Sequence, residues 1–338
     1  MTHSFEAIRE WRNVDAGIFR NEIVARNRPA VLRGLVSHWP AVAAGLDSPR
    51  ALVDYLKQFD RGQPVGTLFA DPAVKGNFFY DESLRGLNFE RRLQQISTSL
   101  DQLLAHLDDP DPPGVAIQSA PIPENLPGFA ARHVIELLAS SVVPRIWIGN
   151  GVTVRTHFDQ VDNLACVVGG RRRFVLFPPE QLPNLYVGPF EFTPAGTPVS
   201  MVSVEQPDLV RYPRFEHALA AAQVAELEPG DAIYIPYYWW HHVQSLEKFN
   251  VLVNYWWNDT SPEIGMPFDV LLHGLLTLRE LPPTQRAVWR AVFDHYVFQT
   301  DGDPAAHLAP EQRGILGPIT PEQRAQIRAA LVRALGRP

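Results

Sequence analysis

The sequence has few of the features that mark special classes of protein. Among its 338 residues there is a single cysteine, Cys166, which excludes a disulfide within the chain and a zinc site built from several cysteines. No apolar run approaches the roughly 20 residues that a membrane-spanning helix needs. The first residues show no basic segment followed by an apolar one, the pattern of a signal peptide. We therefore expect a cytoplasmic protein without a membrane segment.

The sequence also has fewer positively charged than negatively charged residues. The 30 lysines and arginines are outnumbered by 37 aspartates and glutamates, which gives a net charge of −7. A nucleic-acid-binding domain usually carries a basic surface, and the basic run Arg171-Arg172-Arg173 is too short to provide one, so no nucleic-acid partner is expected. Hydrophobic residues make up 46% of the chain, which is typical of a folded domain.

The middle of the sequence, from about residue 144 to 258, is typical of short strands separated by tight turns. Its apolar segments are rich in β-branched and aromatic residues, and Gly, Asn, Pro or Asp separate most of them. The predicted strands are Arg145–Ile148, Asn163–Val168, Arg173–Phe177, Ala232–Ile235 and Asn250–Trp257. Many short strands indicate a mainly β fold with flanking helices, and a double-stranded β-helix, or jelly roll, fits this pattern.

Helical periodicity precedes and follows this middle part. Before it we expect helices at Ala51–Phe59 and Leu93–Leu107 and a strand at Val115–Ser119; after it we expect helices at Phe268–Glu280, Pro283–Val297 and Pro321–Leu335. Thr320 and Gln323 fit a capping box at the start of the last helix. The chain is thus predicted to have two parts: a β domain with a helical N-terminal part (1–262) and a C-terminal helical region (263–338).

Two stretches carry candidate metal ligands. His157 and Asp159 are two residues apart, and at a strand end this spacing directs both side chains to one face. His241 follows a pair of tryptophans beyond the strand Ala232–Ile235, and distant strands can be neighbours in a jelly roll. Two histidines and one carboxylate form the facial triad of non-haem Fe(II) oxygenases, which leaves open positions on the metal. Each stretch alone is more simply a chance match or a packed histidine, but their combination favours a metal site.

Together with their surroundings, these stretches resemble the cupin-like JmjC hydroxylases, especially the branch containing the asparaginyl hydroxylase that acts on hypoxia-inducible factor. The resemblance runs from about Arg28 to Asn258 and rests on the ordered segments RPAVLRG, HFD, GRRRFVLFPP, IPYYWWHHV and VNYWW. It implies an Fe(II)- and 2-oxoglutarate-dependent dioxygenase, a hydroxylase, with His157, Asp159 and His241 as iron ligands. His242 would point to the opposite face of its strand.

The resemblance also implies which residues bind the co-substrate. Arg172 stands where the family usually has a lysine that binds the distal carboxylate of 2-oxoglutarate, and a guanidinium can do this through two parallel hydrogen bonds. Asn163 and Asn254 match polar positions beside the iron and the co-substrate, and nearby Gln118 could contribute. Aromatic residues including Trp147 could supply dry pocket walls, although they fit a plain core equally well.

Departures from the family pattern leave two other functions open. Val154 and Ala116 occupy positions where the family often has a threonine and a tyrosine, so the carboxylate pocket must be shaped differently. One alternative is a metal-dependent cupin that does not use 2-oxoglutarate. The other is a non-catalytic cupin that senses a ligand and engages a partner through its C-terminal helices.

The sequence does not identify the substrate, which is an unidentified protein or a small molecule. Residues 77–82 (NFFYDE) mix aromatic and acidic side chains and form a candidate rim loop, or a loop packed against the barrel. The leucines at 271, 272, 275, 276 and 278 make a strongly apolar helix surface, which predicts a homodimer through the C-terminal helices or simple packing on the barrel.

Overall fold

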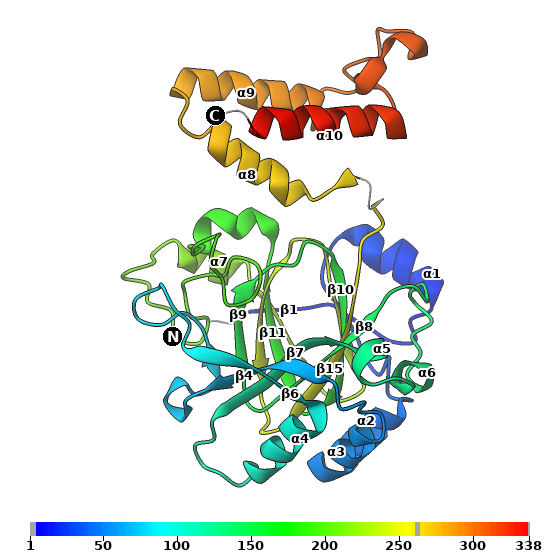
Figure 1. Cartoon of the computed structure of the whole chain (residues 1–338), viewed down its shortest axis with the longest axis vertical. Helices are drawn as coiled ribbons and strands as arrows, with labels where there is room; N and C mark the ends of the chain where they lie inside the picture. Colours follow the sequence, from blue (N-terminus) through cyan, green and yellow to red (C-terminus); the bar gives the residue numbers. More distant parts are fainter. Residues whose placement is uncertain (1–4, 261–263, 337–338) are drawn as a thin grey trace. The chain divides into compact units, whose positions relative to one another are not determined.

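The computed structural model describes residues 5–260 and 264–336. The chain divides into two compact units, Met1–Asp259 and Thr260–Pro338. Figure 1 shows a first unit dominated by strands and a second unit made of helices.

Two β-sheets form the first unit. The larger sheet has nine strands, in the spatial order β2 (Glu10–Trp11), β3 (Ala30–Leu32), β13 (Ala232–Ile235), β10 (Asp162–Gly169), β15 (Asn250–Trp257), β8 (Pro144–Gly149), β7 (Gly114–Pro121), β4 (Pro64–Ala70) and β6 (Phe89–Gln95). The smaller sheet has six, in the order β1 (Glu6–Ala7), β12 (Gln223–Leu227), β11 (Arg172–Phe177), β14 (Trp240–Ser245), β9 (Thr153–His157) and β5 (Asn77–Phe78).

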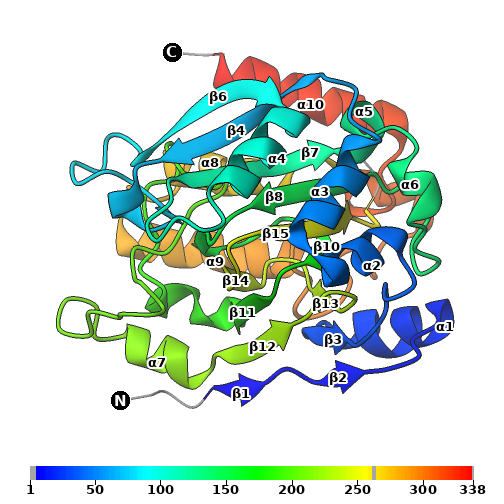
Figure 2. The same cartoon turned by 90° about the horizontal axis from the view of Figure 1, so that it is seen from below.

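Helices lie around these sheets. The α-helices of this unit are α1 (Ala16–Ile18), α2 (Pro40–Asp47), α3 (Pro49–Lys57), α4 (Ile96–Ala105), α5 (Ile122–Asn125), α6 (Phe129–Arg132) and α7 (Phe215–Ala220). Short π or 3-10 turns occur at Phe19–Ile23, Val24–Arg26, Pro72–Val74 and Pro179–Asn184. Figure 2 shows α2, α3 and α4 on one side of the larger sheet and the strands of the smaller sheet on the other.

The central strands of the larger sheet are buried on both faces, as the alternation along β10 shows. Leu164 and Cys166 pack into the core that includes α2, α3 and α4, whereas Ala165 and Val167 pack into a second core with Phe174 and other residues of the smaller sheet. Successive side chains of a strand point to opposite faces, so this strand contributes to both cores. The second core lies between the two sheets, which confirms the predicted jelly roll.

Most predicted elements are present. The predicted strands Ala232–Ile235 and Asn250–Trp257 have the bounds of β13 and β15. The predicted start of the helix at Leu93 is wrong. Leu93 lies on β6 with 75% of its surface exposed, and α4 begins at Ile96. The apolar side chain of Leu93 suggested a longer helix, but its segment pairs with β4 instead.

The second unit contains α8 (Pro267–Thr277), α9 (Pro283–Tyr296) and α10 (Pro321–Leu335), with 3-10 turns at Pro310–Gln312 and Gly314–Leu316. The predicted capping box is confirmed: Thr320 Oγ1 accepts from the Gln323 amide at 3.3 Å, and Gln323 Oε1 accepts from the Thr320 amide at 3.0 Å. None of these three helices has a buried residue. Within residues 5–260 and 264–336, every helix is too short or too polar to cross a bilayer.

Candidate metal centre

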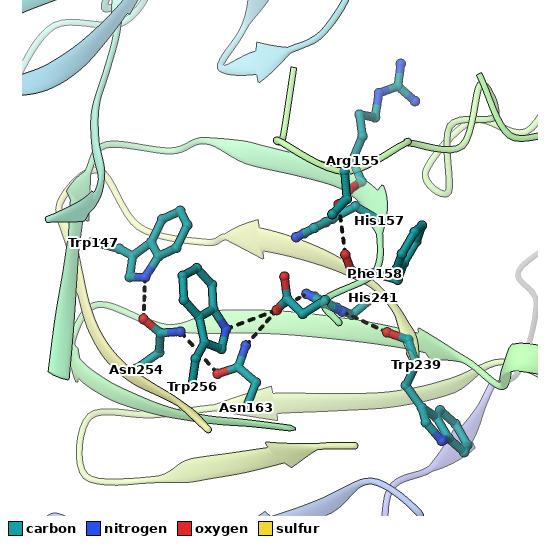
Figure 3. Close-up of polar contacts among 11 residues, drawn as sticks. Trp147, Arg155, His157, Phe158, Asn163, Trp239, His241, Asn254 and Trp256 are labelled. Carbon is teal, nitrogen blue, oxygen red and sulfur yellow. Dashed lines mark hydrogen bonds and ion pairs between the residues drawn. The ribbon is translucent and has the colours of Figure 1, made fainter. Parts of the chain in front are cut away.

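Two neighbouring strands bring the candidate ligands together. His157 ends β9 and stands opposite His241 of the antiparallel strand β14, with their ring centroids 4.2 Å apart. Asp159 follows β9, and its Oδ2 lies 3.6 Å from Nε2 of His241. The ligand atoms of all three residues lie within 4.8 Å of one another, close enough to share one cation. Figure 3 shows the side chains of His157 and His241 close together between the strands.

Backbone carbonyls fix the orientation of both imidazoles. Nδ1 of His157 lies 2.8 Å from the carbonyl oxygen of Arg155, and Nδ1 of His241 lies 3.0 Å from that of Trp239. A carbonyl oxygen only accepts, so each Nδ1 must carry the proton. In the neutral form of each ring, Nε2 then keeps its lone pair for a metal, which is how metal-binding histidines are commonly held.

A chain of hydrogen bonds holds the carboxylate of Asp159 (Figure 3). Its Oδ2 accepts from Nε1 of Trp256 and from Nδ2 of Asn163, both at 3.1 Å. Asn254 in turn donates to Oδ1 of Asn163 at 3.2 Å, and Trp147 donates to Oδ1 of Asn254 at 2.7 Å. Because each amide is engaged at both ends, the carboxylate is oriented by residues of β8, β10 and β15.

The charge state of His157 also suits metal binding. Burial, together with the positive charge that His241 can carry, lowers the pKa of His157 to about 4. The imidazole is therefore neutral at pH 7, which is the form that binds a metal.

Arg172 lies in the same pocket as the triad. The pocket is lined by the triad, Arg172, Asn163, Asn254, two tryptophans and apolar side chains of both sheets. Arg172 is only 5% exposed, and its buried Nε has no hydrogen-bond partner among the residues that the structure describes. Burial lowers its pKa to about 10, so the guanidinium stays charged at pH 7.

The neighbouring residues of the same two strands face the other way. His242 and Arg173 line a separate cavity on the opposite side of the smaller sheet, where Nε2 of His242 lies 2.7 Å from Oε1 of Glu205. This agrees with the predicted opposite orientation of His242, and it leaves His241 as the histidine of β14 that faces the triad pocket.

The remaining predicted site residues are divided between two pockets. Asn163 and Asn254 line the triad pocket, whereas Gln118 lines an adjoining pocket. Val154 lines both pockets, because β9 gains one residue relative to β14 between Val154 and His157. Such a bulge changes which side chains share a face, and the sequence of β9 does not predict it.

The indole donors beside the triad were not predicted as such. The sequence indicated Trp147 only as a pocket wall, whereas its Nε1 donates to Asn254, as the Nε1 of Trp256 does to Asp159. The stretch VNYWW could have indicated the Trp256 donor, because Asn254 and Trp256 are two residues apart and so lie on one face of β15.

Fold and site together define a cupin-like domain of the JmjC type. The family model described as cupin-like domain matches residues 16–263, and the chain belongs to this family, as the motifs predicted. The chain is 31% identical over 281 residues to the lysine-specific demethylase JMJ31 of Arabidopsis thaliana, covering 75% of this chain and 50% of that protein. It is 30% identical over 268 residues to the bifunctional peptidase and (3S)-lysyl hydroxylase JMJD7 of Homo sapiens, covering 71% of this chain and 80% of that protein.

A third relative, the tRNA wybutosine-synthesizing protein 5 of Gallus gallus, is 34% identical over 151 residues, which cover 40% of this chain and 44% of that protein. The chain thus spans about half the length or less of two of these three relatives. The family is that of Fe(II)- and 2-oxoglutarate-dependent oxygenases, and the centre of this chain is consistent with such chemistry.

Proposed function

We propose that the chain is an Fe(II)- and 2-oxoglutarate-dependent hydroxylase. His157, Asp159 and His241 would hold the iron, and Arg172 would bind the distal carboxylate of 2-oxoglutarate. Two relatives are named a lysyl hydroxylase and a lysine demethylase, which supports a protein side chain as the substrate class. When bound, iron and 2-oxoglutarate together activate oxygen and insert one of its atoms into a C–H bond, as 2-oxoglutarate becomes succinate and carbon dioxide.

The buried guanidinium of Arg172 is the observation that carries the proposal. Buried charges in proteins are normally paired, yet Nε of Arg172 has no partner among the residues that the structure describes, and the side chain is 5% exposed in the pocket of the triad. An anion beside the metal would provide the missing charge and hydrogen bonds. A carboxylate can accept two parallel hydrogen bonds from the planar fork of arginine.

The donor set fits the metal. Two imidazoles and a carboxylate are the ligands used by non-haem iron enzymes. The hydrogen bond that Asp159 accepts from Asn163 and those that both Nδ1 atoms donate to backbone carbonyls orient all three. The chain's own contribution is therefore to hold the ligands, to bind the co-substrate anion and to surround both with apolar walls.

The two alternative functions each leave one of these features without a role. A cupin that does not use 2-oxoglutarate has no need for the unpaired guanidinium of Arg172. A purely ligand-sensing module has no need for three oriented ligands that leave several metal positions open.

Calorimetry tests the proposal. The chain is loaded with Mn(II), which does not start turnover, and 2-oxoglutarate is titrated without oxygen. We expect Arg172→Leu to bind 2-oxoglutarate about 100-fold more weakly, the loss of roughly 2.7 kcal/mol that a charged two-point contact provides. Arg172→Lys should keep part of the affinity.

Arg173→Leu is the matched control, because Arg173 is the next residue of β11 and lines the cavity on the other side of the sheet. Equal affinity of the Arg172→Leu and Arg173→Leu proteins for 2-oxoglutarate would contradict the assignment.

A further inference from the structure

A second pocket adjoins the triad. It shares His157, Val154 and Trp147 with the triad pocket. Its polar lining residues are Gln118, Thr153 and Arg155, and no carboxylate lines it. The pocket therefore carries one positive charge and no negative one.

Arg155 is the residue that this charge comes from. Its Nε and Nη1 atoms are buried without a hydrogen-bond partner, and the guanidinium makes no ion pair with the residues that the structure describes. The guanidinium carbon lies 4.4 Å from the centre of the Phe79 ring, a contact that holds a cation but does not neutralise it. Figure 3 shows this side chain extending from β9 away from the metal ligands.

The acidic residue whose charge acts on Arg155 is Glu205, and its carboxylate is already hydrogen-bonded to other residues. Glu205 attracts the guanidinium through space, but its Oε1 lies 2.7 Å from His242 and its Oε2 accepts from Ser203 at 3.0 Å. Among the residues that the structure describes, Glu205 forms its ion pair with His242 and not with Arg155. Leaving charged donors unpaired in a partly buried site costs free energy, so this guanidinium is suited to an anion that arrives with a ligand.

We infer that Arg155 is a specificity-determining residue, and that the adjoining pocket binds a carboxylate of the substrate at a distance from the carbon that is oxidised. Phe78 and apolar side chains of residues 194–199 form the walls, and the lining also includes the amide of Gln118 and the hydroxyl of Thr153, which can act as donors. The substrate class is thus an acidic one: a peptide with a glutamate or aspartate near the oxidised residue. The inference rests on the proposed function, because it takes the shared wall at His157 to be the metal side of the substrate site.

A carboxylate fits this pocket better than a nucleic-acid phosphate. A single guanidinium with two neutral donors matches one carboxylate. The binding of a polyphosphate backbone relies on several cations, and the chain has a net charge of −7.

The test compares two probes whose α-carboxyl is blocked and which differ only in the side-chain group, N-acetyl-L-glutamate α-N-methylamide and N-acetyl-L-glutamine α-N-methylamide. Each is titrated into the full chain loaded with Zn(II) and saturating 2-oxoglutarate, so that the site of Arg172 is filled, and the dissociation constants are measured by ligand-observed NMR. We expect the wild type to bind the acid about 10-fold more tightly than the amide. Arg155→Leu should remove this preference, and Arg155→Lys should restore part of it.

Arg91→Leu is the control, because Arg91 is an exposed arginine on β6 and should keep the wild-type preference. Circular dichroism checks the fold of each variant, and Arg155→Gln takes the place of Arg155→Leu if the latter does not fold. A wild type without preference for the acid, or a preference that survives removal of the guanidinium, would overturn the inference. A separate titration of 2-oxoglutarate into the Zn(II)-loaded wild type shows whether the proposed function itself fails.

Discussion

At the scale of single residues, hydrogen bonds from neighbouring side chains orient the candidate ligands. Asp159 is oriented by Asn163 and Trp256, and the first of these is itself held by Asn254. Partners of this kind usually change metal affinity by one to two orders of magnitude when they are removed. The amides should therefore matter although they need not touch the metal.

We predict that Asn163→Ala weakens Mn(II) binding by about 10- to 100-fold, because the carboxylate of Asp159 loses one of its two donors. Isothermal calorimetry measures the affinity. Asn184→Ala is the control, since the side-chain amide of Asn184 bonds to Gln181 outside the triad pocket. Equal affinity in the two variants would show that Asn163 has no orienting role.

A second residue-scale prediction concerns Glu205, whose carboxylate accepts from the buried His242. Although burial favours the neutral acid, this hydrogen bond and the charge of His242 lower the pKa of Glu205 to about 2, from an ordinary value of 4.5. A carboxyl with a lowered pKa stabilises the fold above its unfolded pKa, and this contribution is lost as the pH falls through the folded pKa. It should be complete above pH 4.5 and decline toward pH 2.

Glu205→Gln should accordingly lower the free energy of unfolding by about 1–2 kcal/mol at pH 7, and by less at pH 3.5. Urea unfolding of both proteins at the two pH values measures this. A difference that is independent of pH would mean that the ionised form of Glu205 is not what stabilises the fold.

At the scale of elements, the sequence predicted best those strands that are buried on both faces. The strands β13 and β15 contain almost only apolar residues, so their bounds could be read directly from the sequence. In contrast, β9 has the sequence TVRTH, in which every residue but Val154 is polar. A strand was expected there only from the spacing of His157 and Asp159. Its pairing and its bulge depend on β14, about 85 residues later, which no local pattern encodes.

The turn between β10 and β11 gives a prediction at this scale. Gly170 has φ +70°, and a Cβ there would lie 2.4 Å from Oδ1 of Asn250 and 2.5 Å from the carbonyl oxygen of Phe249. Gly170→Ala should therefore lower the free energy of unfolding by more than about 2 kcal/mol and disturb Arg172, two residues further on.

Gly196→Ala separates backbone strain from the clash. Gly196 has φ +81° with nothing within 4 Å of an added Cβ, so only the cost of the left-handed backbone, about 1 kcal/mol, should appear. Urea unfolding compares the two variants, and an equal loss would mean that the tight contact at Gly170 is relieved at no cost.

At the scale of the whole molecule, the candidate site lies entirely within the first unit. Its pocket is lined by residues of β8, β9, β10, β11, β13, β14 and β15, which span both sheets, and by Asp159 in the segment after β9. The sequence could predict the triad because a few side-chain types in a fixed order suffice. It could not predict that Gln118 lies in the adjoining pocket, or that Arg155 is left without a counter-ion, because both depend on how the sheets pack.

The second unit leads to a prediction about assembly. None of its three α-helices has a buried residue, and Leu272, Leu276 and Trp289 are 45%, 73% and 45% exposed. Large apolar patches often mark interaction surfaces, so we propose that these helices form a homodimer. Light scattering should give twice the chain mass of 37.9 kDa for the full chain.

Replacing Leu272 and Leu276 together by Glu should return the mass to that of one chain. Leu46→Glu, at a leucine of α2 that is 66% exposed, should leave the dimer intact. A full chain that scatters as a monomer at micromolar concentration contradicts this proposal and leaves the metal centre unaffected.

Anaerobic equilibrium dialysis with Fe(II) tests the central claim most directly, since the claim is that three particular side chains share one cation. The wild type and His242→Ala should each bind one Fe(II) per chain, because His242 faces the opposite side of the sheet. His157→Ala, Asp159→Ala and His241→Ala should each lose at least 100-fold in affinity. Tight binding of Fe(II) by any of these three folded variants, or its loss in His242→Ala alone, would contradict the account.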